Sequence, residues 1–152
     1  MKTLLCCIIA VLAAGYAQAA GQADRFVQKL KLSGDQTAVV AEGDLEARSI
    51  GSYSVRVYSS ENAQPGDDTT FFLAGVVRER DGAVESIALA DVNGDKRDEL
   101  VVTIRSVGTG SYLSAHAYTV GKAKITLAAA VADLPAGTDP VAALRKAAKK
   151  HK

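Results

Sequence analysis

The sequence predicts an all-β protein, an antiparallel β-sandwich of about eight strands followed by a short C-terminal helix. Several segments alternate apolar and polar residues, or are rich in β-branched and aromatic residues, as strands are. These segments follow one another at short spacing with turn residues between them, which is typical of sandwiches and barrels. Near the C-terminus the chemistry changes, because Asp139 can cap a helix whose first residue is Pro140.

The first nineteen residues are expected to be a cleaved secretory signal. A short positive start and the apolar run Leu4–Ala14 precede Ala17-Gln18-Ala19, a small-x-small triplet of the kind that signal peptidase cleaves. An N-terminal membrane anchor is the alternative, but the run is shorter than the ~20 apolar residues that span a bilayer. Both cysteines, Cys6 and Cys7, lie in this run. The mature chain, residues 20–152, must therefore be held together by its core instead of disulfides.

Eight strands are expected in the mature chain. The third is the clearest, because Tyr53, Val55 and Val57 alternate with polar residues and share one face. Asp81-Gly82 is predicted to form a two-residue hairpin turn between the fourth and fifth strands. In order, the expected strands are Arg25–Leu32, Thr37–Ala41, Tyr53–Tyr58, Thr70–Glu79, Ala83–Ala90, Leu100–Ser106, Tyr112–Val120 and Lys124–Val131.

The segment after the strands is expected to form a short helix over Val141–Lys150. Its lysine and arginine side chains gather toward the C-terminus, where cations complement the helix dipole. We expect the basic tail to be solvated and poorly ordered, as chain ends often are. The domain organisation predicted is one sandwich domain over residues 20–138 and a short basic helix or tail over residues 139–152.

The composition restricts the classes of function. The chain has 18 Lys and Arg against 17 Asp and Glu, a formal net charge of +1, so it lacks the broad positive field that grips a nucleic-acid backbone. With only two histidines, a histidine-rich metal cage is hard to build. After the signal, no apolar run approaches membrane length. We therefore expect a soluble mature protein with neither nucleic-acid nor membrane partners.

No catalytic constellation is recognisable in the sequence. His116 shares one face of its expected strand with Ser114 and Tyr118, but a general base also needs an oriented partner and a nucleophile within reach. Adjacent acidic residues such as Asp98-Glu99 point apart on a strand, so they do not form a glycosidase pair. The sequence therefore predicts a protein that is not an enzyme, and an exported enzyme is the least supported function.

The acidic segment 91–99 supports an alternative function. Asp91, Asn93 and Asp95 place oxygen-bearing side chains at alternate positions, as at the start of an EF-hand calcium loop. The match then fails, and the segment looks more like the short aspartate-rich calcium loops between β-strands, in which Asp98 or Glu99 would close the site. Lys96 stands where an EF-hand needs glycine, and the simpler interpretation is a turn whose side chains bond their own backbone. The alternative function is an exported calcium-dependent binding or adhesion module. Otherwise we expect no cofactor.

The segment Arg105-Ser106-Val107-Gly108-Thr109-Gly110-Ser111-Tyr112 joins two well-predicted strands. Its two glycines let the backbone turn tightly, and hydroxyl groups surround them. It is either an ordinary glycine hairpin with solvated hydroxyls or a protruding, uncharged loop that plugs the cleft of another protein. The pattern alone leaves both interpretations open.

With residues 109–112 in view, the chain resembles the periplasmic inhibitors of invertebrate-type (I-type) lysozyme, part of the wider set of bacterial periplasmic lysozyme inhibitors. The family's loop motif is Ser-Gly-x-Tyr, and here Gly110 and Tyr112 match while Thr109 replaces the serine. The resemblance extends over nearly the whole mature chain. The most telling stretches are residues 23–30, 50–56, 64–72 and 105–117.

The resemblance implies a β-sandwich-like fold and export to the periplasm of a Gram-negative bacterium, where the protein would block the I-type lysozyme of an animal host. Thr109 and Tyr112 would contact the enzyme's catalytic carboxylates, and Gly110 would permit the close approach. The loop of residues 62–68 is a further interface candidate from its length and polarity, and the resemblance also allows a homodimer. The supporting residues implied around the loop are Arg105, Ser106, Gly108, Ser111 and His116.

Overall fold

A computed structural model of the protein describes residues 25–61 and 63–150, and the predicted signal peptide lies outside them. In this part of the chain no helix is long and apolar enough to cross a membrane. The described elements are β1 (Val27–Leu32), β2 (Gln36–Glu42), β3 (Ile50–Ser59), β4 (Phe71–Asp81), β5 (Ala83–Ala90), β6 (Glu99–Arg105), β7 (Leu113–Val120), β8 (Ile125–Leu134) and α1 (Pro140–Lys150).

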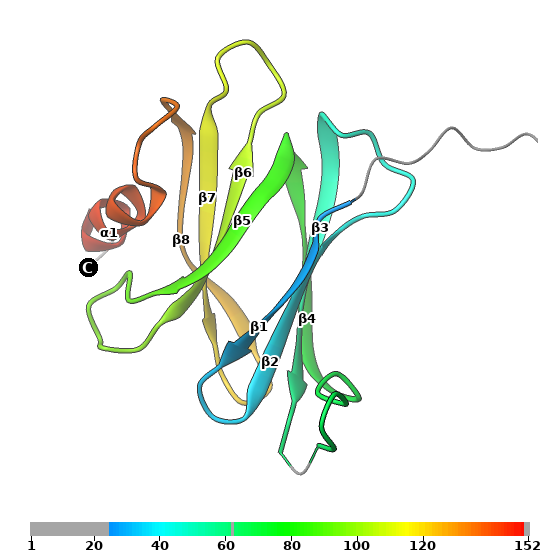
Figure 1. Ribbon diagram of the computed structural model, residues 1–152. Helices are drawn as coiled ribbons and strands as arrows, with labels where there is room; N and C mark the ends of the chain where they lie inside the picture. Colours follow the sequence, from blue (N-terminus) through cyan, green and yellow to red (C-terminus); the bar gives the residue numbers. More distant parts are fainter. Residues whose placement is uncertain (1–24, 62, 151–152) are drawn as a thin grey trace, which may run out of the picture.

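The strands form two four-stranded antiparallel sheets, in the orders β1-β2-β3-β4 and β5-β6-β7-β8. The two sheets pack face to face (Figure 1), so the predicted all-β sandwich with a C-terminal helix is confirmed. Each predicted strand is present, with ends that differ from the prediction by no more than three residues. Because strands that follow one another in sequence pair within each sheet, the two sheets are simple meanders.

The core between the sheets follows from the alternation in the strands. Tyr53, Val55 and Val57 of β3 are fully buried, as their shared face predicted. They belong to one apolar cluster with residues of β6, among them Leu100 and Val102. Burying such side chains is worth roughly 1.5–3 kcal/mol each, which is the main stabilisation available to a domain whose described part has no cysteine.

The predicted hairpin turn at Asp81-Gly82 is wrong. β4 pairs with β3 and β5 pairs with β6, so the chain passes from one sheet to the other at Gly82. Gly82 has a φ of 114°, and a Cβ atom there would lie 2.1 Å from the carbonyl oxygen of Arg105. A sheet-switching corner and a hairpin turn both need the positive φ that glycine adopts easily, so the dipeptide does not distinguish them.

The C-terminal helix is packed against the outer face of the second sheet. The expected poor order is therefore wrong for residues 140–150, although the basic side chains of the helix are exposed, as expected. Leu144 is fully buried in a cluster with Ala115, Ala117 and Ala129 of β7 and β8. These small side chains let the helix approach the sheet closely. The predicted cap is confirmed, because the backbone N–H of Val141 donates to Asp139 Oδ1 at 2.9 Å.

The connecting loops lie at two opposite ends of the sandwich. The upper end in Figure 1 carries residues 43–49 between β2 and β3, the β4–β5 corner and residues 106–112 between β6 and β7. The β3–β4 loop lies at the lower end, because β4 spans the sandwich and an eleven-residue strand is roughly 35 Å long. The described part of the predicted second interface loop, residues 63–68, therefore does not form one continuous surface with residues 109–112.

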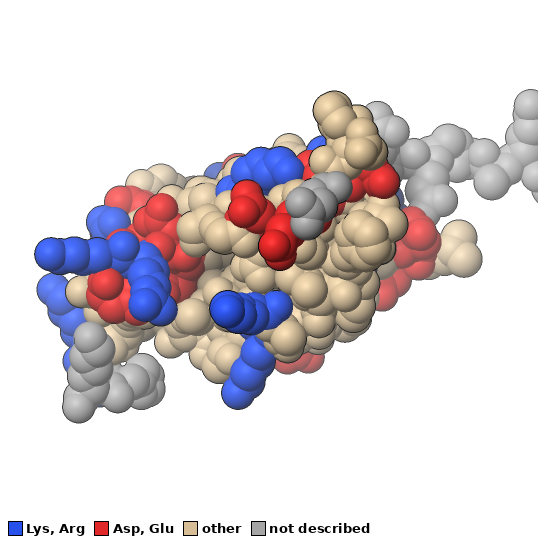
Figure 2. Space-filling view, turned by 90° about the horizontal axis from the view of Figure 1, so that it is seen from below, with Lys and Arg blue, Asp and Glu red and all other residues tan. Residues whose placement is uncertain are grey.

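The lower end carries charges of both signs. Figure 2 views the molecule from that side and shows acidic and basic side chains mixed with uncharged ones. Asp68 in the β3–β4 loop forms ion pairs with Lys29 and Lys31, at 2.6 and 2.9 Å. These bonds hold the pKa of the Asp68 carboxyl well below its usual range. This end offers no broad field of a single sign.

Candidate functional site

The loop between β6 and β7, residues 106–112, is closed by its own backbone. The N–H of Ser106 donates to the carbonyl oxygen of Tyr112 at 2.9 Å, which closes the base. The N–H of Ser111 donates to the carbonyl oxygen of Gly108 at 3.2 Å, which makes a tight turn at the tip. Figure 1 shows the loop projecting beyond the ends of the strands. The sequence therefore builds a compact protrusion here.

Arg105 fixes this loop to the neighbouring strand. Its Nη1 donates to the carbonyl oxygen of Ser111 at 3.1 Å. Its Nε and Nη2 donate to Glu85 Oε1 on β5, at 2.9 and 2.8 Å. Arg105 thus lies at the loop and positions it, while a supporting contact of Arg105 with a partner stays a prediction. Sequence reasoning missed Glu85, because only the pairing of β5 with β6 places it beside Arg105.

Tyr112 lies against the backbone of the loop. A Cβ atom at residue 110 would fall 2.2 Å from Cε2 of the Tyr112 ring, so only glycine leaves room for the ring there. Tyr112 remains 50% exposed, and Thr109 and Gly110 are exposed beside it. Ser111 has a φ of 46°, in the left-handed region that costs an L residue roughly 1–2 kcal/mol. The bond from Arg105 to the Ser111 carbonyl helps to hold this conformation.

The loop presents hydroxyl groups and no charge of its own. Thr109 and Tyr112 each carry an O–H that can donate to a carboxylate, and hydrogen bonds to charged acceptors are the stronger kind. Val107, also exposed, places an apolar side chain on the same loop. A rigid protrusion with this chemistry suits an acidic cleft on another molecule.

His116 is not brought to the loop. It lies in β7 with its ring between the sheets, and its Nδ1 is 2.6 Å from the hydroxyl of Tyr53. That hydroxyl is also hydrogen-bonded to the hydroxyl of Tyr118. Burial, together with the nearby charge of Arg78, lowers the pKa of His116 from 6.5 to about 4. His116 is therefore a neutral part of the interior at neutral pH, although the resemblance implied a supporting contact.

The acidic segment 91–98, between β5 and β6, folds as a turn whose side chains bond the backbone. Asp91 accepts hydrogen bonds from the N–H groups of Gly94 and Lys96, at 2.7 and 3.0 Å. Asn93 Oδ1 accepts from the N–H of Asp95 at 2.8 Å. Lys96 adopts a φ of 67°, the left-handed conformation that glycine usually provides.

Glu99 is the fourth residue of the predicted calcium set. It is buried, and it accepts hydrogen bonds from the N–H of Val92 at 2.9 Å and from Asn93 Nδ2 at 2.8 Å. Among the described residues no group of three or more His, Cys, Asp and Glu is arranged to hold a metal ion. These contacts are those of the simpler turn interpretation, and calcium binding at Asp91, Asn93, Asp95 and Glu99 stays a prediction.

Comparisons with known proteins point to one family. The family model described as periplasmic lysozyme inhibitor of I-type lysozyme matches residues 24–148. The crystal structure of PliI-Ah, such an inhibitor from Aeromonas hydrophila, is 40% identical with a TM-score of 0.72, and the match covers 78% of this chain and 98% of that one. The comparison with curated proteins gave no match.

A second solved structure shows a protein of this kind in complex with a lysozyme. It is Aeromonas hydrophila PliI in complex with Meretrix lusoria lysozyme, again 40% identical, with a TM-score of 0.71. The match covers 79% of this chain and 95% of that chain. The similarity therefore extends over nearly the whole of both solved inhibitors.

Proposed function

The chain belongs to the family of periplasmic lysozyme inhibitors of I-type lysozyme, and from this premise we propose that it inhibits an I-type lysozyme by inserting the loop of residues 106–112 into the enzyme's cleft. The observation that carries the proposal is the compact, hydroxyl-bearing protrusion at the upper end of the sandwich. An inhibitor of this kind needs no catalytic residue of its own.

The chemistry of the target supports this role for the loop. A lysozyme cleft holds two carboxyl groups, one of which is protonated and acts as the general acid. The hydroxyls of Thr109 and Tyr112 would donate hydrogen bonds to the ionised oxygens, and the exposed backbone at Gly110 would allow close approach. The loop contains no glycosidic bond, so the enzyme has nothing to cleave.

The bonds inside the loop support tight binding. Ordering a mobile loop on binding costs free energy, which reduces affinity. Here the closure at Ser106 and Tyr112, the turn at Gly108 and the bond from Arg105 fix the loop before it meets the enzyme. The entropy lost on association is correspondingly small.

The place of action proposed is the periplasm. The predicted signal of residues 1–19 would direct export, and an inhibitor there would meet lysozyme that has crossed the outer membrane. A homodimer remains a prediction that the same purified protein can test by sedimentation.

The test is a titration of peptidoglycan lysis by an I-type lysozyme, with c-type and g-type enzymes measured beside it. We expect stoichiometric loss of the I-type activity. Thr109→Val and Tyr112→Phe each remove one hydroxyl with little change of shape, and each should raise the inhibition constant about tenfold or more, since hydrogen bonds to charged groups contribute roughly 1.5–3 kcal/mol. Failure of the wild-type protein to inhibit the I-type enzyme would overturn the proposal.

Matched controls lie at the lower end of the sandwich. Thr126→Val removes a hydroxyl from an exposed position of β8, and Tyr58→Phe removes one from a tyrosine that packs against Phe72. Both should leave the inhibition constant within twofold of wild type. If the controls weaken inhibition as much as the loop variants do, the loop is not the inhibitory element.

A further inference from the structure

Leu45, in the loop between β2 and β3, combines two unfavourable features. Its side chain is 91% exposed, although leucine gains most from burial. Its φ is 62°, a left-handed conformation that is uncommon for a residue with a branched side chain. Backbone strain of this kind persists only where the surrounding structure imposes it, and it is concentrated at functional sites.

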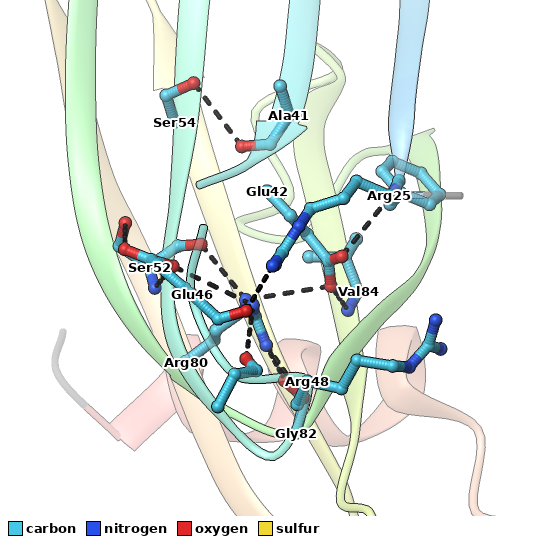
Figure 3. A network of polar contacts seen from close by, with 12 residues as sticks. Arg25, Ala41, Glu42, Glu46, Arg48, Ser52, Ser54, Arg80, Gly82 and Val84 are labelled. Atoms are coloured by element: carbon cyan, nitrogen blue, oxygen red, sulfur yellow. Dashed lines mark hydrogen bonds and ion pairs between the residues drawn. The ribbon is translucent and has the colours of Figure 1, made fainter. Parts of the chain in front are cut away.

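The surrounding loop, residues 43–49, is held inward by Glu46. The N–H and hydroxyl of Ser52 donate to the two carboxylate oxygens of Glu46, at 2.5 and 2.7 Å, which lowers the pKa of this carboxyl. Cβ atoms at Gly43 and Gly51 would lie within 2.6 Å of the same carboxylate, so only glycines leave room for it. The carboxylate therefore lies between the end of β2 and the start of β3. Figure 3 shows its contact with Ser52.

Arg80 holds the second half of the loop. Its guanidinium is fully buried and donates to the carbonyl oxygens of Ala47 and Arg48, at 3.1 and 2.9 Å (Figure 3). Its Nε lies 3.6 Å from Glu42 Oε1, which balances the buried charge. Arg25 also donates to the carbonyl oxygen of Glu46. The loop is thus bound to the sandwich along its length, and Leu45 is its one large apolar side chain, exposed among small and charged neighbours.

The loop belongs to the same end of the molecule as residues 106–112. The N–H of Gly82 donates to the carbonyl oxygen of Ser49 at 2.8 Å. Gly82 also lies directly against Arg105 and Ser106, at the base of the other loop. The β4–β5 corner therefore connects the bases of the two loops at the upper end of the sandwich.

A stable interface with lysozyme needs more contact area than the loop of residues 106–112 provides. A complex of standard size buries about 800 Å² on each partner, from about 20–30 residues, and a seven-residue loop cannot supply that alone. We propose that Leu45 is a second anchor, which packs against an apolar surface beside the cleft of the same I-type lysozyme. This inference rests on the proposed function and extends it to a second contact.

The decisive variant is Leu45→Asn. Asparagine tolerates the left-handed conformation, so the melting temperature should stay the same or rise. The affinity for I-type lysozyme, measured by surface plasmon resonance, should fall about tenfold or more, because a buried leucine contact is lost. A residue with a merely structural role would not give this combination of retained stability and lost affinity. Leu45→Ala should weaken binding similarly while keeping the strain.

The matched control is Phe71→Ala, which removes a large exposed apolar side chain at the lower end and should leave affinity within twofold. If Leu45→Asn binds lysozyme within twofold of wild type while Thr109→Val binds weakly, the second anchor is overturned and the proposed function stands. Failure of the wild-type protein to bind would overturn both. A dimer that dissociates in Leu45→Asn, with unchanged lysozyme affinity, would assign Leu45 to contact with a second copy and overturn the inference.

Discussion

The position of the Tyr112 ring depends on the absence of a side chain at residue 110. In Gly110→Ala the new Cβ would meet the ring at 2.2 Å, and the ring must move. Because both residues are at the exposed tip, we expect the melting temperature to change by no more than a few degrees while the inhibition constant for I-type lysozyme rises about tenfold, the effect of roughly 1.4 kcal/mol.

Gly108→Ala is the control for this substitution. A Cβ atom at residue 108 meets nothing within 4 Å, and its φ is not in the left-handed region. Its inhibition constant should therefore stay near that of wild type. Equal effects of the two alanine substitutions would show that the placement of the Tyr112 ring does not matter for inhibition.

His116 predicts how stability depends on pH. Its pKa is about 4 in the folded protein and 6.5 in the unfolded chain, so the unfolded chain binds the proton first as the pH falls. His116 therefore lowers the free energy of unfolding progressively from about pH 7 to about pH 4. Urea unfolding at pH 7.5 and pH 5 should show a larger loss for wild type than for His116→Gln. Parallel losses would mean that His116 titrates normally in the fold.

At the scale of elements, the β4–β5 corner depends on Arg80. The fully buried guanidinium bonds carbonyl oxygens of the β2–β3 loop, of Ser52 and of Gly82, and it pairs with Glu42. Arg80→Ala would leave Glu42 buried without its cation, and breaking a buried pair typically costs about 3–5 kcal/mol.

Urea unfolding measures this loss directly. Arg80→Lys keeps the charge but offers fewer donors in a different geometry, so its free energy of unfolding should lie between those of Arg80→Ala and wild type. A change below about 1 kcal/mol in Arg80→Ala would show that the corner is held by packing and not by this network.

The turn between β5 and β6 gives a test for calcium. The oxygens of Asp91, Asn93 and Asp95 already accept backbone hydrogen bonds, so an ion would have to replace these bonds to bind. We expect no increase in melting temperature when millimolar calcium is added to protein treated with a chelator. A saturable increase that Asp91→Asn removes would instead support the calcium-dependent module.

For the whole molecule, the sequence predicts the strands well because alternation reports directly on burial. Tyr53, Val55 and Val57 illustrate this, since the fold requires one face of β3 to be inside. The pairing of strands is less accessible. Asp81-Gly82 has the residues of a hairpin turn, but the sheet to which β5 belongs is decided by long-range packing. The alanines that receive α1 likewise give no local sign of a docked helix.

The candidate site was predictable only where its residues leave a local pattern in the sequence. The loop of residues 106–112 was recognisable from its glycines, its hydroxyls and the family resemblance. Glu85, Arg80 and Leu45 were not, because a contact across strands, a buried arginine and a left-handed leucine leave no pattern along the chain. His116 is close to the loop in sequence, and only the inward face of β7 places its half-buried ring beside Tyr53 instead.

The two ends of the sandwich differ in the loops and charges that they carry. The upper end carries two fixed loops joined through Gly82, and the lower end carries mixed charges and the acidic turn. This arrangement places the inhibitory loop and the proposed second anchor on one surface. It also makes the lower end the natural place for control substitutions.

The most direct test of loop insertion is competition for the cleft. The affinity of the protein for an I-type lysozyme should be measured by calorimetric titration, first with the cleft open and then with it filled by an oligosaccharide of the substrate's sugar chain. We expect the apparent association constant to fall in proportion to the fraction of clefts left open. An affinity that is unchanged at saturating oligosaccharide would show that the protein binds elsewhere on the enzyme, and it would contradict insertion of residues 106–112 into the cleft.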